Sequence, residues 1–270
     1  MKKILVTCPP MLRQIDRLQQ DFLALNFEVT APNVVQTLSE AELIELVPRH
    51  DGWIIGDDPA TESVFKAGKS GHLKAAVKWG VGVDNVDFHA CEELQIPIMN
   101  TPGMFGAEVA DLAICYLIGL ARNAFLIDRE IRAGHWPKPT GVSLSGRTLG
   151  VVGLGDIGTN IASRASALGL NVIGWDPAPK SIPAAITHKI WPADIGECDF
   201  LVFACALNSE TKHMFNAELL ALLKRDIRVI NISRGDLIDE SALLKGLEAG
   251  LIASAALDVF ETEPLPWGST

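Results

Sequence analysis

The residues of this chain best suited to chemistry form a glycine-rich turn, Gly153-Leu154-Gly155-Asp156-Ile157-Gly158, directly after the apolar run 149–152. In a strand–turn–helix unit the first glycine permits a tight turn, the second lets backbone approach a pyrophosphate, and the third lets the helix pack on the sheet. The pyrophosphate then lies on the free N–H groups that begin the helix. The segment therefore predicts a dinucleotide site, and the alternative is a glycine turn used only for packing.

An acidic residue, Asp176, ends the next apolar run at 171–175. A carboxylate at that strand end accepts hydrogen bonds from a ribose 2′-OH and repels a 2′-phosphate. No arginine occurs in the following segment Pro177-Ala178-Pro179-Lys180. The pattern favours NAD over NADP, although Lys180 leaves NADP open. The alternative role for Asp176 is that of a turn-former before Pro177.

Three further predicted strand ends carry polar or glycine residues, and ligands of open α/β sheets bind at the carboxyl ends of strands. Arg234 follows one strand, and its guanidinium can pair with a carboxylate or polarise a carbonyl. Glu263 follows another and could orient a catalytic base. Gly80 and Gly82 follow a third and could offer backbone N–H groups to a carboxylate. The alternatives are an interdomain salt bridge, a solvated loop acid and a simple turn, respectively.

Alternating strand and helix patterns must position these residues. Strands are predicted at 3–7, 53–55, 76–79, 97–99, 149–152, 171–175, 200–204, 229–232 and 253–259. Helices are predicted at 12–25, after the capping box Ser39-Glu40-Ala41-Glu42, and at 217–223 and 240–248. This rhythm indicates an α/β fold of two doubly wound parallel-sheet domains. We expect the domains to comprise residues 1–99 and 100–270.

A long apolar helix is predicted to begin at Ala107 and to end at Gly134-His135-Trp136-Pro137. Helical spacing relates Val109, Leu112, Ala113, Tyr116, Leu117 and Leu120, while Ile114 and Ile118 make a second face apolar. A helix that is apolar on two faces is buried on two sides. We therefore expect it between domains or in a subunit interface.

Composition and charge exclude several classes of protein. With 270 residues, 48% of them hydrophobic, the chain can bury a sizeable core, and its net charge of −10 argues against nucleic acid or an anionic membrane as partner. The longest apolar stretch, 112–121, is too short to span a bilayer. Five scattered cysteines without a C-x-x-C pair indicate a reducing, cytoplasmic location. Six histidines without a cluster argue against a metal site.

Taken together, these segments resemble the D-isomer-specific 2-hydroxyacid dehydrogenases, and the likeness covers essentially the whole chain. It rests on residues 80–87 (GVGVDNVD), 100–103 (NTPG), 144–155 (LSGRTLGVVGLG), 231–240 (NISRGDLIDE) and 256–264 (ALDVFETEP). The resemblance implies a flavodoxin-like substrate domain followed by a Rossmann NAD-binding domain, which usually mediates a homodimer. It also implies hydride transfer between NAD and a small D-2-hydroxy acid or 2-oxo acid.

The resemblance further implies a role for each matched residue. Arg234 would bind the carboxylate and carbonyl of the substrate, Glu263 would pair with a catalytic histidine, and the backbone of Val81, Gly82 and Val83 would hold the carboxylate. The implied cofactor contacts run from the pyrophosphate (Gly153, Gly155, Asp156, Ile157 and Gly158) through the adenosine ribose (Asp176) and the adenine side (Cys205, Ala206 and Leu207) to the nicotinamide end (Ile232, Ser233, Arg234 and Asp258).

Two departures from the family pattern bear on function. The family's acid/base histidine and a returning C-terminal helix lie beyond the Glu-Pro motif, whereas this sequence ends at Gly268-Ser269-Thr270 and has no histidine after His213. Losing general acid–base catalysis costs roughly 10²–10⁴-fold in rate. An NAD-binding regulatory protein or pseudo-enzyme without turnover is therefore the alternative function. Oxidation of formate or phosphite on the same scaffold is a third.

The second departure concerns the substrate. Phosphoglycerate-acting members carry an Arg-Ser pair after the strand at 53–55, where this chain has Gly56-Asp57-Asp58-Pro59. Acid in place of arginine argues against a phosphorylated substrate. We expect Asp57, Asp58, Met104 and Phe105 to contribute to the substrate pocket, although none of them identifies the acid.

Overall fold

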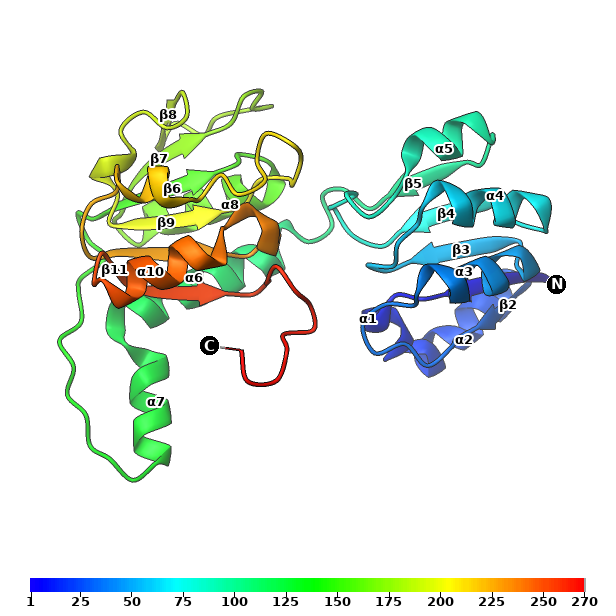
Figure 1. The fold of residues 1–270 in the computed structure, drawn as a ribbon, viewed down its shortest axis with the longest axis horizontal. Coiled ribbons are helices and arrows are strands. Elements are labelled where there is room, and N and C mark those ends of the chain that lie inside the picture. Colours follow the sequence, from blue (N-terminus) through cyan, green and yellow to red (C-terminus); the bar gives the residue numbers. More distant parts are fainter. Residues whose placement is uncertain (270) are drawn as a thin grey trace. The chain divides into compact units, whose positions relative to one another are not determined.

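The computed structural model describes residues 1–269 and divides into two compact units, Met1–Met104 and Phe105–Thr270. Each unit is a parallel sheet with helices on both faces (Figure 1). The predicted division between residues 99 and 100 falls inside a strand of the first sheet, so we use the structural bounds. Thr270, the last residue of the second predicted domain, lies outside the described residues.

The first unit has five parallel strands in the order β2-β1-β3-β4-β5. The strands are β1 (Lys2–Val6), β2 (Phe27–Thr30), β3 (Gly52–Ile55), β4 (Ala75–Lys78) and β5 (Ile98–Asn100). The helices are α1 (Pro9–Leu12), α2 (Ile15–Ala24), α3 (Glu40–Leu46), α4 (Glu62–Ser70) and α5 (Phe88–Glu93), with a 3-10 turn η1 (Val47–Arg49). The order 2-1-3-4-5 is that of flavodoxin-like sheets, which confirms the predicted fold of this unit.

The core of the first unit lies between its sheet and helices α3, α4 and α5. Leu43, Phe65 and Cys91 from these helices are fully buried in one cluster with Trp53 of β3. The Trp53 and Phe65 rings lie 5.9 Å apart. Helix α3 begins at the predicted capping box, in which Ser39 caps Glu42 and the Glu42 side chain accepts the Ser39 N–H at 2.8 Å. The start of α3 is therefore fixed by local sequence.

The second unit has six parallel strands in the order β11-β10-β9-β6-β7-β8. The strands are β6 (Thr148–Val152), β7 (Asn171–Trp175), β8 (Ile186–Lys189), β9 (Phe200–Phe203), β10 (Ile227–Asn231) and β11 (Ile252–Leu257). The helices are α6 (Gly106–Arg122), α7 (Ala124–Arg132), α8 (Asp156–Ala167), α9 (Ala217–Leu220) and α10 (Glu240–Glu248), with 3-10 turns η2 (Ile195–Glu197) and η3 (Gly235–Leu237). Counted from β6 the order is 3-2-1-4-5-6, the Rossmann arrangement, as predicted.

Two apolar layers sandwich the second sheet. Helices α6 and α8 bury Ala113, Leu117 and Ile161 against one face. Helices α9 and α10 bury Leu219 and Leu243 against the other. The strands between them are apolar on both sides, as expected for a parallel sheet covered by helices on both faces.

The predicted elements differ from the structure mainly where helices break. The helix expected to run from Ala107 to Gly134 divides at Asn123, which adopts a left-handed conformation with φ 57°, and α6 and α7 lie at 71° to one another. Asparagine visits that conformation more readily than most residues, so a kink forms without glycine. The helix expected at 12–25 begins only at Ile15, after the short α1. The short edge strands β2 and β8 were not predicted.

Within residues 1–269, no single helix is long and apolar enough to cross a membrane. Among the described helices, only α6 and α7 taken together, as a bent pair, have the length and the apolar composition of a membrane span. Four side chains of α6 that are buried to 1% exposure or less, Ala110, Ala113, Leu117 and Ala121, belong to the core of the second unit.

Candidate functional site

The glycine-rich turn lies at the point where the strand order of the second sheet reverses. Strand β6 pairs with β7 on one side and with β9 on the other, and the turn joins β6 to α8. Gly153 has φ +94°, a conformation that L side chains rarely adopt. A Cβ on Gly158 would lie 1.9 Å from the Gly153 carbonyl oxygen, so α8 packs onto the turn only through glycine. The tight turn predicted at Gly153 and the close helix packing predicted at Gly158 thus have a physical basis in this structure.

The middle glycine, Gly155, faces open space. It is exposed, has φ −69°, and a Cβ placed on it would meet no protein atom within 4 Å. No side chain caps the start of α8 within the described residues, so the positive end of that helix is directed at this space. Asp156 is the first residue of α8 and Ile157 the second. The combination is a cradle open to an anionic group.

Asp176 connects the end of β7 to the glycine turn. One carboxylate oxygen accepts the N–H of Leu154 at 2.8 Å, and the other accepts the N–H of Ala178 at 2.8 Å. The Asp176 residue is half-buried, and a carboxylate oxygen has lone pairs for more than one donor. Asp176 therefore shapes the turn and keeps acceptor capacity for a ribose hydroxyl. The turn-former role is also visible in its bond to Ala178.

The ends of β9 and β10 are joined beside this cradle. The Ser233 hydroxyl donates to the Cys205 carbonyl, and the Ser233 N–H donates to the buried Asn231 side chain. Cys205, Ala206 and Leu207 begin the loop after β9, while Ile232 and Ser233 follow β10. Burial raises the pKa of the Cys205 thiol to about 11, so it remains a neutral thiol near neutral pH. These residues form one continuous edge next to the glycine turn.

Arg234 lies where the loops after β10 and β11 meet. A Cβ on the next residue, Gly235, would lie 1.9 Å from the Phe260 carbonyl carbon, so only glycine permits this backbone contact. Glu240 and Glu261 exchange hydrogen bonds, each accepting the backbone N–H of the other at 3.0 and 2.8 Å. The Asn231 side chain also donates to the Arg234 carbonyl at 2.8 Å. The position of Arg234 relative to the second loop is therefore closely determined.

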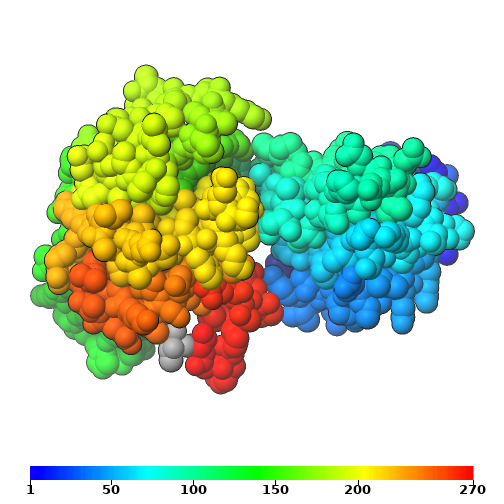
Figure 2. Space-filling model, turned by 45° about the horizontal axis from the view of Figure 1, so that its top comes forward, coloured from blue at the N-terminus to red at the C-terminus, as the bar shows by residue number. Residues whose placement is uncertain are grey.

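Glu263 and Asp258 belong to the segment after β11, which lies on the surface of the second unit beside α10 (Figure 2). Glu263 is exposed, and one of its carboxylate oxygens accepts the Phe260 N–H at 2.9 Å. The Asp258 N–H donates to the Asn231 carbonyl, and its carboxylate accepts the Tyr116 hydroxyl of α6 at 3.3 Å. Burial, and then the Asp258 charge, raises the pKa of Tyr116. The structure thus brings Arg234, Asp258 and Glu263 to one edge of the sheet.

The predicted carboxylate loop follows β4 in the first unit. Its base is fixed by Thr101, whose hydroxyl accepts the Gly80 N–H at 2.9 Å and whose own N–H donates to the Gly80 carbonyl. In the part of the chain that the structure describes, the N–H groups of Val81, Gly82 and Val83 have no protein acceptor. Val81 and Val83 are each 38% exposed. Three consecutive available N–H groups are suited to binding an anion.

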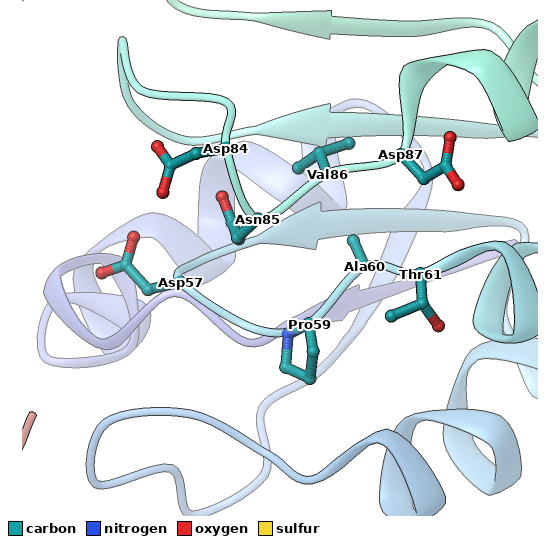
Figure 3. Close-up of a pocket in the computed structure, with 8 residues that line it drawn as sticks. All are labelled: Asp57, Pro59, Ala60, Thr61, Asp84, Asn85, Val86 and Asp87. Carbon is teal, nitrogen blue, oxygen red and sulfur yellow. The ribbon is translucent and has the colours of Figure 1, made fainter. Parts of the chain in front are cut away.

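A cavity of about 460 Å³ lies beside this loop, between the segments that follow β3 and β4 (Figure 3). Asp57 is among the residues that line it. The expectation for Asp58 was wrong: its carboxylate is fully buried and accepts hydrogen bonds from Thr7, Leu38 and Gly56. Burial raises the pKa of Asp58. Because its hydrogen bonds reach the ends of β1 and β3 and the segment before α3, Asp58 holds these parts of the chain together. Met104 and Phe105 are not among the residues that line this cavity, and their place in a substrate pocket stays a prediction.

Sequence reasoning missed two residues of this region. Lys78, the last residue of β4, is 2% exposed, and its ammonium donates to the Gly56 carbonyl at 2.5 Å and to Asp57 at 2.9 Å. The Asn85 side chain donates to the Gly56 and Asp58 carbonyls at 3.1 and 2.7 Å. The available signal for Lys78 was a lysine at the end of an otherwise apolar strand. The sequence offered none for Asn85.

Within residues 1–269, no group of three or more histidine, cysteine, aspartate or glutamate residues could hold a metal ion. The five cysteines are free, and Cys8, Cys91 and Cys198 are buried.

The strand order, the glycine turn at its reversal and the acid at the next strand end define the second unit as a dinucleotide-binding Rossmann domain. A family model described as D-isomer specific 2-hydroxyacid dehydrogenase, NAD binding domain, matches residues 114–270. The chain therefore belongs to the D-isomer specific 2-hydroxyacid dehydrogenase family, and its second unit is an NAD-binding domain. The open cradle at Gly155 and the acceptor at Asp176 fit that cofactor.

Individual relatives agree with this family. The chain is 36% identical to D-3-phosphoglycerate dehydrogenase of Methanocaldococcus jannaschii over 98% of this chain and 50% of that protein, so it spans half the length of that relative. It is 34% identical to hydroxypyruvate reductase of Thermotoga maritima over 84% of this chain and 74% of that protein. The crystal structure of the TT0316 protein from Thermus thermophilus matches with a TM-score of 0.86 and 33% identity, covering 99% of this chain and 85% of that one.

Proposed function

We propose that this protein catalyses reversible hydride transfer between NAD(H) and a small D-2-hydroxy acid or its 2-oxo acid. The observation that carries the proposal is the junction at Gly235, which places Arg234 beside the Glu261–Glu263 segment at the cofactor edge of the Rossmann sheet. Family membership supports the same chemistry. In the reductive direction the 2-oxo acid takes up a hydride at C2 and a proton at oxygen.

The residues of the site divide this work between binding and polarisation. Bound NADH supplies the hydride from its nicotinamide ring. Val81, Gly82 and Val83 bind the carboxylate of the acid through backbone N–H groups. The Arg234 guanidinium of the second unit is suited to bind a carboxylate and to polarise a C2 carbonyl, which stabilises negative charge that develops on oxygen. In the family pattern, Glu263 would pair with an acid/base histidine that exchanges the proton with that oxygen. Residues 264–270 contain no histidine, so the donor of this proton is not among the residues named here.

The cofactor contacts are proposed in the order that the family resemblance implies. Gly153, Gly155, Asp156, Ile157 and Gly158 would form the turn that receives the pyrophosphate, and Asp176 would hold the adenosine ribose. Cys205, Ala206 and Leu207 would flank the adenine side, while Ile232, Ser233, Arg234 and Asp258 would contact the nicotinamide end. This assignment rests on the shared edge formed by the ends of β6, β7, β9, β10 and β11.

The test is an NADH-consumption assay of the full-length protein with glyoxylate, pyruvate and hydroxypyruvate. We expect NADH oxidation with at least one acid. An Arg234→Lys variant should lose far more turnover than NADH affinity, because lysine cannot reproduce the planar fork with which arginine polarises the carbonyl. NADH binding without oxidation of any of the three acids would instead favour the regulatory or pseudo-enzyme function. If only formate or phosphite reduced NAD, the result would favour the third candidate function, oxidation of formate or phosphite.

We further propose that the protein is a cytoplasmic homodimer. The bent α6–α7 segment and the loop after it carry exposed apolar side chains, including Phe125 at 46%, Ile131 at 43% and Trp136 at 79%. Exposed apolar groups collected on one segment are typical of subunit interfaces. The free, largely buried cysteines support a reducing compartment. Sedimentation equilibrium checks the assembly, and a monomer at micromolar concentration would contradict it.

A further inference from the structure

The only tyrosine of the sequence, Tyr116, lies on α6 and reaches the residue that follows β11. Its hydroxyl donates a hydrogen bond to the Asp258 carboxylate at 3.3 Å, although the two residues are 142 positions apart in the chain. Strand β11 carries a small side chain at Ala256, which packs against the same core cluster as Leu117 of α6. The contact therefore joins a helix of the core to the strand end proposed to meet the nicotinamide.

The Tyr116 ring is held from beyond the kink at Asn123. Phe125 of α7 meets it edge-on, with ring centroids 6.2 Å apart and ring planes at 71°. A Cβ on Gly119, one turn along α6, would lie 2.1 Å from Cε2 of Phe125, so only glycine leaves room for this ring. Edge-to-face packing is a favoured arrangement of aromatic pairs. The break between α6 and α7 thus helps to fix the direction of the phenol.

The Tyr116 hydroxyl is a donor at neutral pH. Burial of the ring, and then the negative charge of Asp258, raises the pKa of Tyr116 above its ordinary value. A protonated phenol has one proton to donate, whereas an ionised carboxylate only accepts. The direction of the hydrogen bond from Tyr116 to Asp258 is therefore determined by chemistry as well as by geometry.

The Asp258 side chain has little else to orient it. The residue is exposed, and its backbone N–H donates to the Asn231 carbonyl at 2.9 Å, which fixes the main chain alone. Within residues 1–269, the Asp258 carboxylate accepts a side-chain hydrogen bond from Tyr116 and from no other residue. A carboxylate has acceptor sites for several donors, so this one keeps capacity for a ligand. The phenol therefore selects one orientation of a carboxylate that is still open to a further donor.

We infer that Tyr116 is a positioning residue, whose hydroxyl holds the Asp258 carboxylate in the orientation that accepts an N–H of the nicotinamide carboxamide. The inference rests on the proposed function, in which Asp258 contacts the nicotinamide end of the cofactor. The carboxamide NH₂ is the one hydrogen-bond donor that a nicotinamide ring carries. Fixing this group fixes the rotation of the ring, and hence the face from which C4 delivers the hydride to the 2-oxo acid.

A cofactor analogue tests the role of the carboxamide directly. In reduced 3-acetylpyridine adenine dinucleotide a methyl group replaces the NH₂, so the donor to Asp258 is lost. Tyr116→Phe keeps the ring and removes the hydroxyl, and it should raise the dissociation constant for NADH by about 3- to 10-fold, the size of one net hydrogen bond. The dissociation constant for the analogue should change by less than about twofold, because the analogue makes no use of the oriented carboxylate.

A double-mutant cycle tests whether Tyr116 acts through Asp258. Once Asp258→Ala has removed the carboxylate, adding Tyr116→Phe should weaken NADH binding by less than about twofold more. The matched control is Ser241→Ala, which removes a hydroxyl from an exposed position on α10 in the same unit and should leave both dissociation constants unchanged. Equal losses for NADH and the analogue in Tyr116→Phe, an unchanged affinity for NADH, or additive losses in the cycle would each overturn the inference.

A spectroscopic measurement on the unaltered sequence does not depend on how the variants fold. Tyrosine labelled with ¹³C at Cζ reports the hydrogen bonding of its hydroxyl, and among residues 1–270 Tyr116 gives the only such resonance. Saturation with NADH should shift this resonance, because the carboxamide shares the carboxylate that accepts from the phenol. The acetylpyridine analogue should cause a smaller shift. Equal shifts with both cofactors, or no shift with NADH, would contradict the positioning role.

Turnover separates failure of this inference from failure of the proposed function. If a 2-oxo acid oxidises NADH while Tyr116→Phe affects the two cofactors equally, hydride transfer stands and the positioning role is wrong. If no 2-oxo acid oxidises NADH, hydride transfer is refuted, and the dissociation constants for NADH and the analogue still decide the role of Tyr116.

Discussion

The open space at Gly155 leads to a prediction that separates folding from cofactor binding. A methyl group at this position meets no protein atom within 4 Å, and the backbone angles of φ −69° and ψ −163° lie close to the extended region open to all residues. Replacing such a glycine by alanine reduces the conformational freedom of the unfolded chain. Gly155→Ala should therefore leave the free energy of unfolding of the protein without cofactor unchanged, or raise it by about 0.4–1 kcal/mol.

The same methyl group should weaken NADH binding, because it enters the space where the pyrophosphate approaches the backbone. Inserting one methyl into a packed contact costs about 1–3 kcal/mol. The dissociation constant should thus rise about 5- to 150-fold. Urea denaturation and a fluorescence titration with NADH measure the two quantities. An unchanged dissociation constant for NADH would show that the space at Gly155 does not receive the cofactor. A large loss of stability in the protein without cofactor would show that this space is not open to a methyl group.

Three other perturbations test separate parts of the structure. Gly235→Ala must move the Arg234 loop by roughly 1 Å because its methyl would lie 1.9 Å from the Phe260 carbonyl carbon. A shift of that size should lower kcat/KM about 100-fold and weaken NADH binding by a smaller factor, and normal kinetics would contradict the close contact at Gly235. Hydrogen bonds from Lys74 and from the Lys3 N–H lower the pKa of Asp51 to about 2, so its contribution to stability is present above its ordinary pKa and is lost as the pH falls toward 2; the melting temperature of Asp51→Asn should be below wild type at pH 7 and converge with it in acid, and a constant difference would refute this. Ile131→Glu should shift the sedimentation equilibrium toward monomer while unit stability is kept, and an unchanged dimer would exclude this part of α7 from the interface.

Local signals in the sequence were sufficient for much of the fold. The capping box at Ser39 fixed the start of α3, and the glycine turn fixed the junction of β6 with α8. Both depend on contacts between residues a few positions apart, which a sequence displays directly. The alternation of strands and helices predicted parallel sheets covered by helices, whereas the flavodoxin-like and Rossmann arrangements were expected only from the family resemblance.

The missed features depend on contacts between distant residues. The kink at Asn123 is one example, since the apolar pattern continues across it and only the packing of α6 and α7 shows the break. Lys78 is another: its charge suggests a surface residue, and burial becomes possible only because Gly56 and Asp57 come from a neighbouring strand end. Asp58, one residue further along, points inward instead. Adjacent aspartates in the sequence therefore gave no indication of which one faces the cavity.

The glycines of the family motifs show why residue type alone does not define a site. Gly158 and Gly235 are required because a Cβ would lie 1.9 Å from protein backbone, so their absence of a side chain serves packing within the chain. Gly155 lies in the same kind of motif, yet a Cβ there would meet nothing within 4 Å. No packing contact within the chain requires glycine at this position, and the proposed approach of a pyrophosphate supplies a reason for it. Gly158 and Gly235 are thus required by the packing of this chain, whereas Gly155 fits the proposed cofactor contact.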